Sequence, residues 1–171
     1  MNPWPDLRPI LDGIDWVIVG GVATRAYMPE RMTQDIDILV RRTDQLAAIT
    51  KLKQAGYEII TPLAIGGYAL RSPEGIEVDV LLGDSAWLND ALAISQYDAA
   101  GFPVIDLPYL VLLKMSAQRA QDWADVSRML GLASDDRLDD VRAIVAKYMP
   151  EDSEDLESLI FIGKQENSGN K

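Results

Sequence analysis

The chain has 171 residues and contains neither cysteine nor histidine, which excludes disulfides, thiol nucleophiles, histidine-based triads and the usual zinc sites. Its 27 acidic and 16 basic side chains give a formal net charge of −11 at pH 7, which argues against broad electrostatic binding to nucleic acid. Any chemistry must depend on carboxylates, lysine, arginine, hydroxyls and the backbone. The metals that suit such ligands are hard ones, chiefly Mg²⁺, Mn²⁺ or Ca²⁺.

The apolar residues are distributed as in a water-soluble domain. The chain has no apolar run of about 18 residues, which a membrane-spanning helix would need. The segment Met1–Asp12 lacks the basic start and apolar stretch of a secretory signal. We therefore expect a cytoplasmic protein that does not contact membranes.

The N-terminal part alternates apolar strands with short helices. In chain order the pattern predicts a short helix within Pro3–Leu11, a strand at Trp16–Val19, a short helix at Val22–Tyr27, a strand at Asp35–Val40, a helix from Thr43 to Ala55, a strand at Tyr57–Thr61, a hairpin of Tyr68–Arg71 with Ile76–Leu82, a helix from Asp84 to Leu92 and a strand at Val104–Asp106.

From Pro108 onward the apolar spacing is helical. Helices are predicted at Tyr109–Ala117, at Gln121–Leu130 with Gly131 as the stop, around Leu138–Tyr148 and at Glu151–Ile162. This order indicates an α+β fold with a mixed β-sheet flanked by helices and a helical C-terminal region. We expect an α/β core at residues 1–106, a helical region at 107–163 packed on it, and a disordered tail at 164–171.

Three aspartates carry the most informative pattern. Asp35 and Asp37 are two residues apart on one predicted strand, so their side chains share a face, roughly 6.6 Å apart along the chain. Glu77 and Asp79 likewise share one face of a later strand. Carboxylates that face one volume repel each other unless a cation lies between them. Asp35, Asp37 and Asp79 are therefore candidate ligands of Mg²⁺.

A glycine pair precedes these strands. Gly20 and Gly21 lack a Cβ, so their backbone N–H groups could approach a phosphate closely where a helix begins. Neither of the commoner phosphate motifs, GxxxxGK[ST] and GxGxxG, occurs in the chain. The alternative is that the glycines form only a turn.

Together these segments resemble the nucleotidyltransferase superfamily related to DNA polymerase β. Gly20-Gly21 followed by Asp35-Ile-Asp-Ile is similar to its signature, and Val78-Asp79-Val80 is similar to its third-carboxylate strand. Arg31-Met-Thr33 resembles the small bacterial branch that includes AbiEii-type toxins. That branch also has helices with a Lys…Arg-x-x-Asp-x-x-Asp pattern, which is similar to the spacing of Lys114, Arg119, Asp122 and Asp125. The chain departs from the signature at Gly21, where many members have serine.

The resemblance implies a nucleotidyltransferase-like fold and a Mg²⁺- or Mn²⁺-dependent enzyme that moves NMP from an NTP to an acceptor hydroxyl. Asp35 and Asp37 would bind metal and triphosphate, and Asp79 would bind metal and help to deprotonate the acceptor. Gly20 and Gly21 would cradle phosphate oxygens. Lys114 and Arg31 would neutralise the triphosphate, and Asp122 would orient Lys114 or complete the site. Thr33 or Thr24 would replace the missing serine hydroxyl.

The acceptor and the partners stay open at this level. A tRNA 3′ end, a protein or a small antibiotic of aminoglycoside or lincosamide type could accept the nucleotide. A non-catalytic role beside an antitoxin or toxin protein is the other possibility. Simpler interpretations also exist: the aspartates could form a solvated strand face, Lys114 could extend its amine out of an apolar helix, and Arg119 with Asp122 could be an ordinary i,i+3 ion pair.

Overall fold

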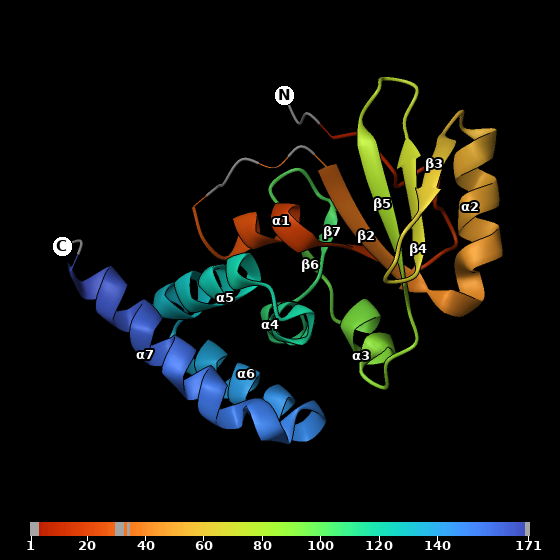
Figure 1. Cartoon of the computed structure of the whole chain (residues 1–171). Coiled ribbons are helices and arrows are strands. Elements are labelled where there is room, and N and C mark those ends of the chain that lie inside the picture. Colours follow the sequence, from red (N-terminus) through yellow and green to blue (C-terminus); the bar gives the residue numbers. More distant parts are fainter. Residues whose placement is uncertain (1–3, 30–32, 34, 170–171) are drawn as a thin grey trace. The chain divides into compact units, whose positions relative to one another are not determined.

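The computed structural model describes residues 4–29, 33 and 35–169 (Figure 1). These residues form two compact units. Residues 4–23, Thr33 and residues 35–105 belong to the first unit, and residues 24–29 and 106–169 belong to the second. The short segment 24–29 thus groups with the C-terminal helices, although residues 4–23 before it and 35–105 after it belong to the first unit.

The first unit contains one mixed sheet, whose strand order within the described residues is β3-β4-β5-β2-β1-β7-β6. The pairs β2–β5 and β1–β7 are parallel and the other pairs are antiparallel. The strands are β1 (Trp16–Val19), β2 (Asp35–Arg41), β3 (Glu58–Pro62), β4 (Gly67–Arg71), β5 (Glu77–Gly83), β6 (Gln96–Tyr97) and β7 (Pro103–Val104). The predicted α+β fold with a mixed sheet flanked by helices is confirmed.

The two faces of β2 and β5 differ in polarity. Ile36 and Ile38 of β2 and Val78 and Val80 of β5 are fully buried on one face. The aspartates alternate with them and point to the other face. Burial of the apolar face contributes about 25 cal/mol per Å². The core therefore fixes which face of the sheet carries the carboxylates.

Three helices accompany the sheet in the first unit: α1 (Gly20–Ala23), α2 (Gln45–Gln54) and α3 (Leu88–Ala93). Helix α2 runs alongside the sheet and buries Ala48 and Leu52 (Figure 1). The predicted starts differ from these bounds. Helix α1 begins at Gly20 rather than Val22, and a 3₁₀ turn at Arg42–Asp44 precedes α2 in place of a helix start at Thr43.

In this unit one expectation, a helix that starts with Asp84 as its cap, is wrong, and one strand is missed, both for local reasons. Asp84 does not cap α3, because its carboxylate accepts a hydrogen bond from Arg42 Nε at 2.8 Å and the helix begins only at Leu88. The two-residue strand β6 is not predicted, since so short a segment leaves no alternation to detect.

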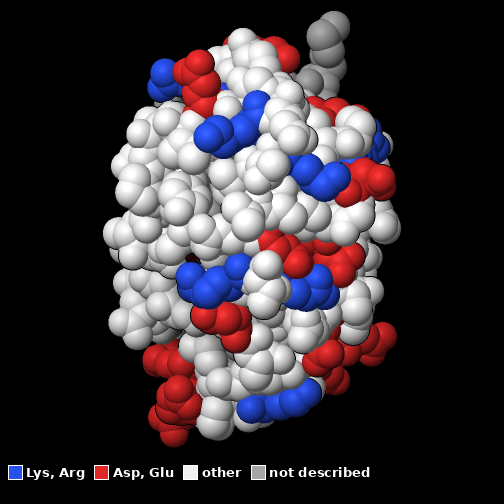
Figure 2. Space-filling model, turned by 90° about the vertical axis from the view of Figure 1, so that its right-hand side faces the viewer, with Lys and Arg blue, Asp and Glu red and all other residues white. Residues whose placement is uncertain are grey.

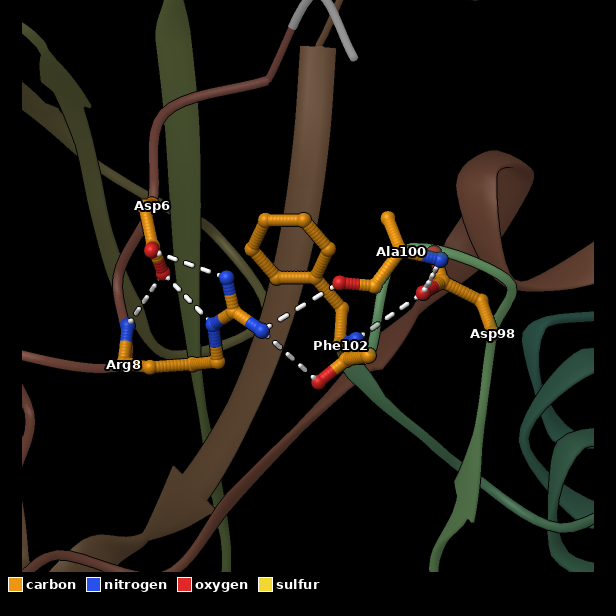
Figure 3. A network of polar contacts seen from close by, with 6 residues as sticks. Asp6, Arg8, Asp98, Ala100 and Phe102 are labelled. Carbon is orange, nitrogen blue, oxygen red and sulfur yellow. Dashed lines mark hydrogen bonds and ion pairs between the residues drawn. The ribbon is translucent and has the colours of Figure 1, made fainter.

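The N-terminal segment forms turns where a short helix is predicted. Arg8 donates from Nε to Asp6 Oδ1 at 2.8 Å, and from Nη1 to Ala100 O at 3.2 Å (Figure 3). Its guanidinium also lies 4.7 Å from the ring centroid of Phe102. Asp98 closes the β6–β7 connection by accepting from the backbone N–H of Phe102 at 2.8 Å. Side-chain bonds of this kind compete with helix formation and tie the segment to that connection.

The second unit is built from four long helices: α4 (Leu107–Ala117), α5 (Ala120–Leu132), α6 (Asp135–Tyr148) and α7 (Ser153–Gly169). Asp106 caps α4 by accepting from Leu107 N at 2.9 Å, and Pro108 occupies the first turn. No helix of the described residues is long and apolar enough to cross a membrane.

Gly131 does not end α5, as the sequence predicts, but lies inside it. A Cβ on Gly131 would lie 2.3 Å from the carbonyl oxygen of Gly163, and a Cβ on Gly163 would lie 1.9 Å from that of Ser127. Helices α5 and α7 therefore cross with their backbones in contact, and glycine at both positions permits it.

Helix α7 extends to Gly169, beyond the end predicted near Ile162 and into the segment expected to be disordered. Lys164 donates from Nζ to Ala133 O at 2.8 Å, and Asn167 donates from Nδ2 to Gly131 O at 3.3 Å. These carbonyls belong to the C-terminal end of α5, where helical carbonyls lack partners. The added hydrogen bonds hold the last turns of α7 in the helical state.

Candidate active site

Three carboxylates meet on the polar face of the first unit. The parallel pairing of β2 with β5 sets Asp37 opposite Asp79 and Asp35 opposite Glu77. One carboxylate oxygen from each of Asp35, Asp37 and Asp79 lies within 4.8 Å of the other two, and all three side chains are half-buried. The structure thus brings together the three aspartates that the sequence singles out.

The surroundings of Asp79 disfavour its anionic form. Burial raises the pKa of its carboxyl, and the negative charges of Asp35 and Glu77 raise it further. Its Oδ1 atom is buried and has no hydrogen-bond partner among the described residues. Buried oxygens are almost always partnered, so this atom suits a bound cation. The donor set, with its three carboxylates, fits Mg²⁺ or Mn²⁺.

Gly20 gives Asp37 the space it occupies. Gly20 follows the last residue of β1, Val19, which pairs with Asp37 in the sheet. Its φ is +63°, and a Cβ built on it would lie 1.9 Å from Asp37 Oδ2. The space that a side chain at Gly20 would fill is therefore taken by a carboxylate of the triad. Gly21 is buried in α1.

The residues before β2 are only partly described. Thr33 donates from Oγ1 to Asp35 Oδ1 at 2.9 Å, so its hydroxyl contacts a carboxylate of the triad. Thr24, the other candidate for the missing serine hydroxyl, is fully buried in the second unit. Arg31 lies outside the described residues.

Lys114 is the centre of a buried ion cluster in the second unit. Its side chain is 4% exposed, and Nζ donates to Asp122 Oδ1 at 2.9 Å and to Asp125 Oδ2 at 2.8 Å. Arg119 Nε donates to Asp122 Oδ2 at 2.5 Å, and Gln121 Nε2 donates to Asp125 Oδ1 at 3.0 Å. The predicted i,i+3 pair of Arg119 with Asp122 is present, and Lys114 does not extend to solvent.

The cluster shifts the titration of one carboxyl. Burial raises the pKa of Asp122, but hydrogen bonds from Arg119 and Lys114 outweigh that effect and leave it below its usual value. Asp122 therefore binds the Lys114 ammonium in the folded protein. Asp125, whose role the sequence leaves open, accepts a second hydrogen bond from the same ammonium.

Glu77 is a neighbour of the triad that received no role from the sequence. It is exposed, lies opposite Asp35 in the sheet and adds to the negative field at Asp79. The alternation along Ile76–Leu82 already places it on the face of Asp79, so this signal was available. Four carboxylates thus lie along two adjacent strands.

Comparison with known proteins supplies the fold but no family. No family model and no curated protein sequence matches the chain. Among solved structures, the lincomycin-bound lincosamide antibiotic adenylyltransferase LnuA superposes with a TM-score of 0.55 at 17% identity, covering 75% of this chain and 92% of that one. ANT(2″)-Ia in complex with adenylyl-2″-tobramycin gives 0.52 at 13% identity, covering 94% of both chains.

A solution structure of the antibiotic-resistance factor ANT(2″)-Ia agrees with these matches, with a TM-score of 0.50 at 14% identity over 95% of this chain and 90% of that one. The chain therefore has a nucleotidyltransferase fold with C-terminal helices.

Proposed function

We propose that the protein is a Mg²⁺- or Mn²⁺-dependent nucleotidyltransferase that moves NMP from an NTP to an acceptor hydroxyl. The observation that carries this proposal is the convergence of Asp35, Asp37 and Asp79 within 4.8 Å, with a buried Asp79 oxygen that lacks a partner among the described residues. These three side chains would hold the metal. The nucleotidyltransferase fold supports the same activity.

In this reaction the acceptor oxygen bonds to the α-phosphorus of the NTP, and the bond from that phosphorus to the bridging oxygen breaks to release pyrophosphate. The bound metal would supply positive charge to the phosphate oxygens. Asp79 would help to accept the proton of the acceptor hydroxyl, which is the general-base role that the resemblance implies.

The remaining assignments concern the triphosphate. Gly20 and Gly21 offer backbone N–H groups, and Lys114 and Arg31 offer positive charge. Lys114 is held by Asp122 and Asp125, which supports a fixed rather than a mobile ammonium. Asp122 then acts as the residue that orients it. Positioning and neutralisation of charge carry most of the catalysis in phosphoryl transfer, and neither requires histidine or cysteine.

Two observations favour a small-molecule acceptor of antibiotic type. LnuA and ANT(2″)-Ia, two of the solved structures with the same fold, carry lincomycin and an adenylylated tobramycin. On the face of the molecule shown in Figure 2, basic side chains stand beside acidic ones rather than forming a continuous basic surface. Clustered basic residues are what a tRNA acceptor would need.

A tRNA 3′ end or a protein acceptor, as in toxin–antitoxin systems, is the second candidate. It is supported by the likeness of Arg31-Met-Thr33 and the Lys114 region to the AbiEii-type branch. A non-catalytic partner of an antitoxin would have no need for three converging carboxylates, so that alternative is the weakest.

The test is incubation of the purified protein with Mg²⁺ and each α-³²P-labelled NTP, in separate reactions with tobramycin, lincomycin, total tRNA or cell extract proteins. We expect label on one acceptor class, no label with Asp37→Ala, and no label after chelation of the metal. Label on tRNA alone would remove the antibiotic proposal. Absence of label everywhere, with no NTP binding by calorimetry in Mg²⁺, would overturn the enzymatic proposal.

A further inference from the structure

We propose that Thr33 is a positioning residue of the carboxylate site, which holds Asp35 in the orientation that a divalent cation requires. The inference rests on the proposed metal-dependent function. It assigns the Thr33 hydroxyl to the metal-binding carboxylate and not to a phosphate of the substrate.

The hydrogen bond itself identifies the acceptor. Thr33 Oγ1 lies 2.9 Å from Asp35 Oδ1 and 3.4 Å from the Asp35 carbonyl oxygen. A hydroxyl carries one proton, so it donates to the nearer carboxylate oxygen. A phosphate would need the same proton, and Thr33 cannot supply it to both. Thr33 therefore does not replace the serine hydroxyl that is missing at Gly21.

Asp35 is the triad member whose place in the fold leaves it most in need of such a partner. It is the first residue of β2, whereas Asp37 lies within the strand beside Gly20, and Asp79 lies within β5. The hydroxyl holds Oδ1 and restricts rotation of the carboxylate, while Oδ2 is left for another ligand. Residues that bind metal-ligating side chains commonly orient them in this way.

The chemistry of the donor also suits a cation site. A lysine or arginine in place of Thr33 would place a positive charge beside Asp35 and compete with the metal. A hydroxyl donates a hydrogen bond without adding charge, so the attraction of the triad for a cation is kept.

The experiment measures Mn²⁺ binding by the loss of the free-ion signal in electron paramagnetic resonance, for the full chain without nucleotide. We expect Thr33→Val to weaken Mn²⁺ binding by about tenfold or more. Thr33→Ser keeps the hydroxyl and should bind close to the wild type. Thr50→Val, at an exposed position of α2, is the matched control and should bind as the wild type does.

Thr33→Ala provides a second variant without the hydroxyl and guards against a steric effect of the valine side chain. It should weaken Mn²⁺ binding as Thr33→Val does. Unchanged Mn²⁺ affinity in both would overturn the inference, as would equal weakening by Thr33→Ser. A wild-type protein that binds no Mn²⁺ would overturn the proposed function itself. Wild-type binding that survives in Thr33→Ala overturns only the role of Thr33.

Discussion

A Cβ on Gly20 would lie 1.9 Å from Oδ2 of Asp37, so the absence of a side chain at one position makes room for the carboxylate at the other. The two residues are neighbours across the β1–β2 pair, since Val19 pairs with Asp37. Gly20 thus makes room for a carboxylate of the triad, apart from any contact with phosphate.

Gly20→Ala should lose Mn²⁺ binding and nucleotidyl transfer, because the new methyl group must displace the Asp37 carboxylate. Gly75→Ala is the matched control: Gly75 also has a positive φ, +86°, but nothing lies within 4 Å of its Cβ position. Both variants should lose about 1–2 kcal/mol from backbone strain, as measured by urea unfolding. Normal Mn²⁺ binding by Gly20→Ala would contradict the steric argument.

Asp79→Asn should distinguish two effects of the Asp79 carboxylate: its repulsion by neighbouring carboxylates and its binding of a metal ion. Asp79 is destabilised as an anion by burial and by Asp35 and Glu77, so the neutral amide should leave the melting temperature of the metal-free protein unchanged or higher. Added Mg²⁺ should raise the melting temperature of the wild type but not that of the variant. Exposed Asp12 provides the control: Asp12→Asn should respond to Mg²⁺ as the wild type does. A clear drop in the metal-free melting temperature of Asp79→Asn would count against the proposed repulsion.

Lys114→Met should destabilise the second unit by about 3–5 kcal/mol, because it leaves the buried carboxylates of Asp122 and Asp125 without their ammonium. Urea unfolding at pH 7 measures the loss, with Lys53→Met, at an exposed position of α2, as the control. The triple variant that also carries Asp122→Asn and Asp125→Asn should recover part of the stability. A loss no larger than that of the control would show that the cluster is not needed for folding.

The same cluster makes the free energy of unfolding depend on pH in the acid range. The pKa of Asp122 is lowered in the folded protein, so the folded state holds that proton less tightly than the unfolded chain does. The stabilisation from the ionised Asp122 carboxylate is fully present above the pKa of an unfolded aspartate, about 3.9. It is lost as the pH falls through the lower pKa of Asp122 in the folded protein. The free energy of unfolding should therefore fall more steeply below pH 4 in the wild type than in Asp122→Asn. Parallel pH profiles would refute the assignment.

Gly163→Ala should destabilise the protein by about 1–3 kcal/mol, because the added methyl would lie 1.9 Å from the Ser127 carbonyl and force α5 and α7 apart. Gly169→Ala, in the last turn of the same helix, has nothing within 4 Å of its Cβ position and should cause no loss. Thermal unfolding of the two variants provides the comparison. Equal melting temperatures of the two variants would mean that α7 can move away from α5 without loss of stability.

Much of the first unit is predictable because its pattern is local. The alternation of Asp35 and Asp37 with Ile36 and Ile38 predicts both the strand and the shared face of the carboxylates. The second strand with Asp79 follows from the same reasoning. The sequence also predicts that the two strands supply one metal site, but it does not show that they are adjacent and parallel, which only the sheet pairing establishes.

What could not be predicted depends on contacts between distant segments. Gly131 looks like a helix stop, because glycine is a common residue after a helix end, but α7 packs against it and the helix continues. The bond of Lys114 to Asp125 crosses from α4 to α5. Likewise, Gly20 and Thr33 suggest phosphate ligands, whereas their contacts with Asp37 and Asp35 appear only in three dimensions.

The pairing of β2 with β5 has a consequence for how substitutions are tolerated. A slip of one residue between these strands would move Asp37 away from Asp79 and bring apolar side chains to the polar face. Substitutions at Ile36, Ile38, Val78 or Val80, which touch no ligand, can therefore disable the protein by changing alignment rather than chemistry. Under the proposed function, divalent-ion affinity becomes a sensitive measure of correct strand alignment, because the buried residues of β2 and β5 set the positions of the three carboxylates.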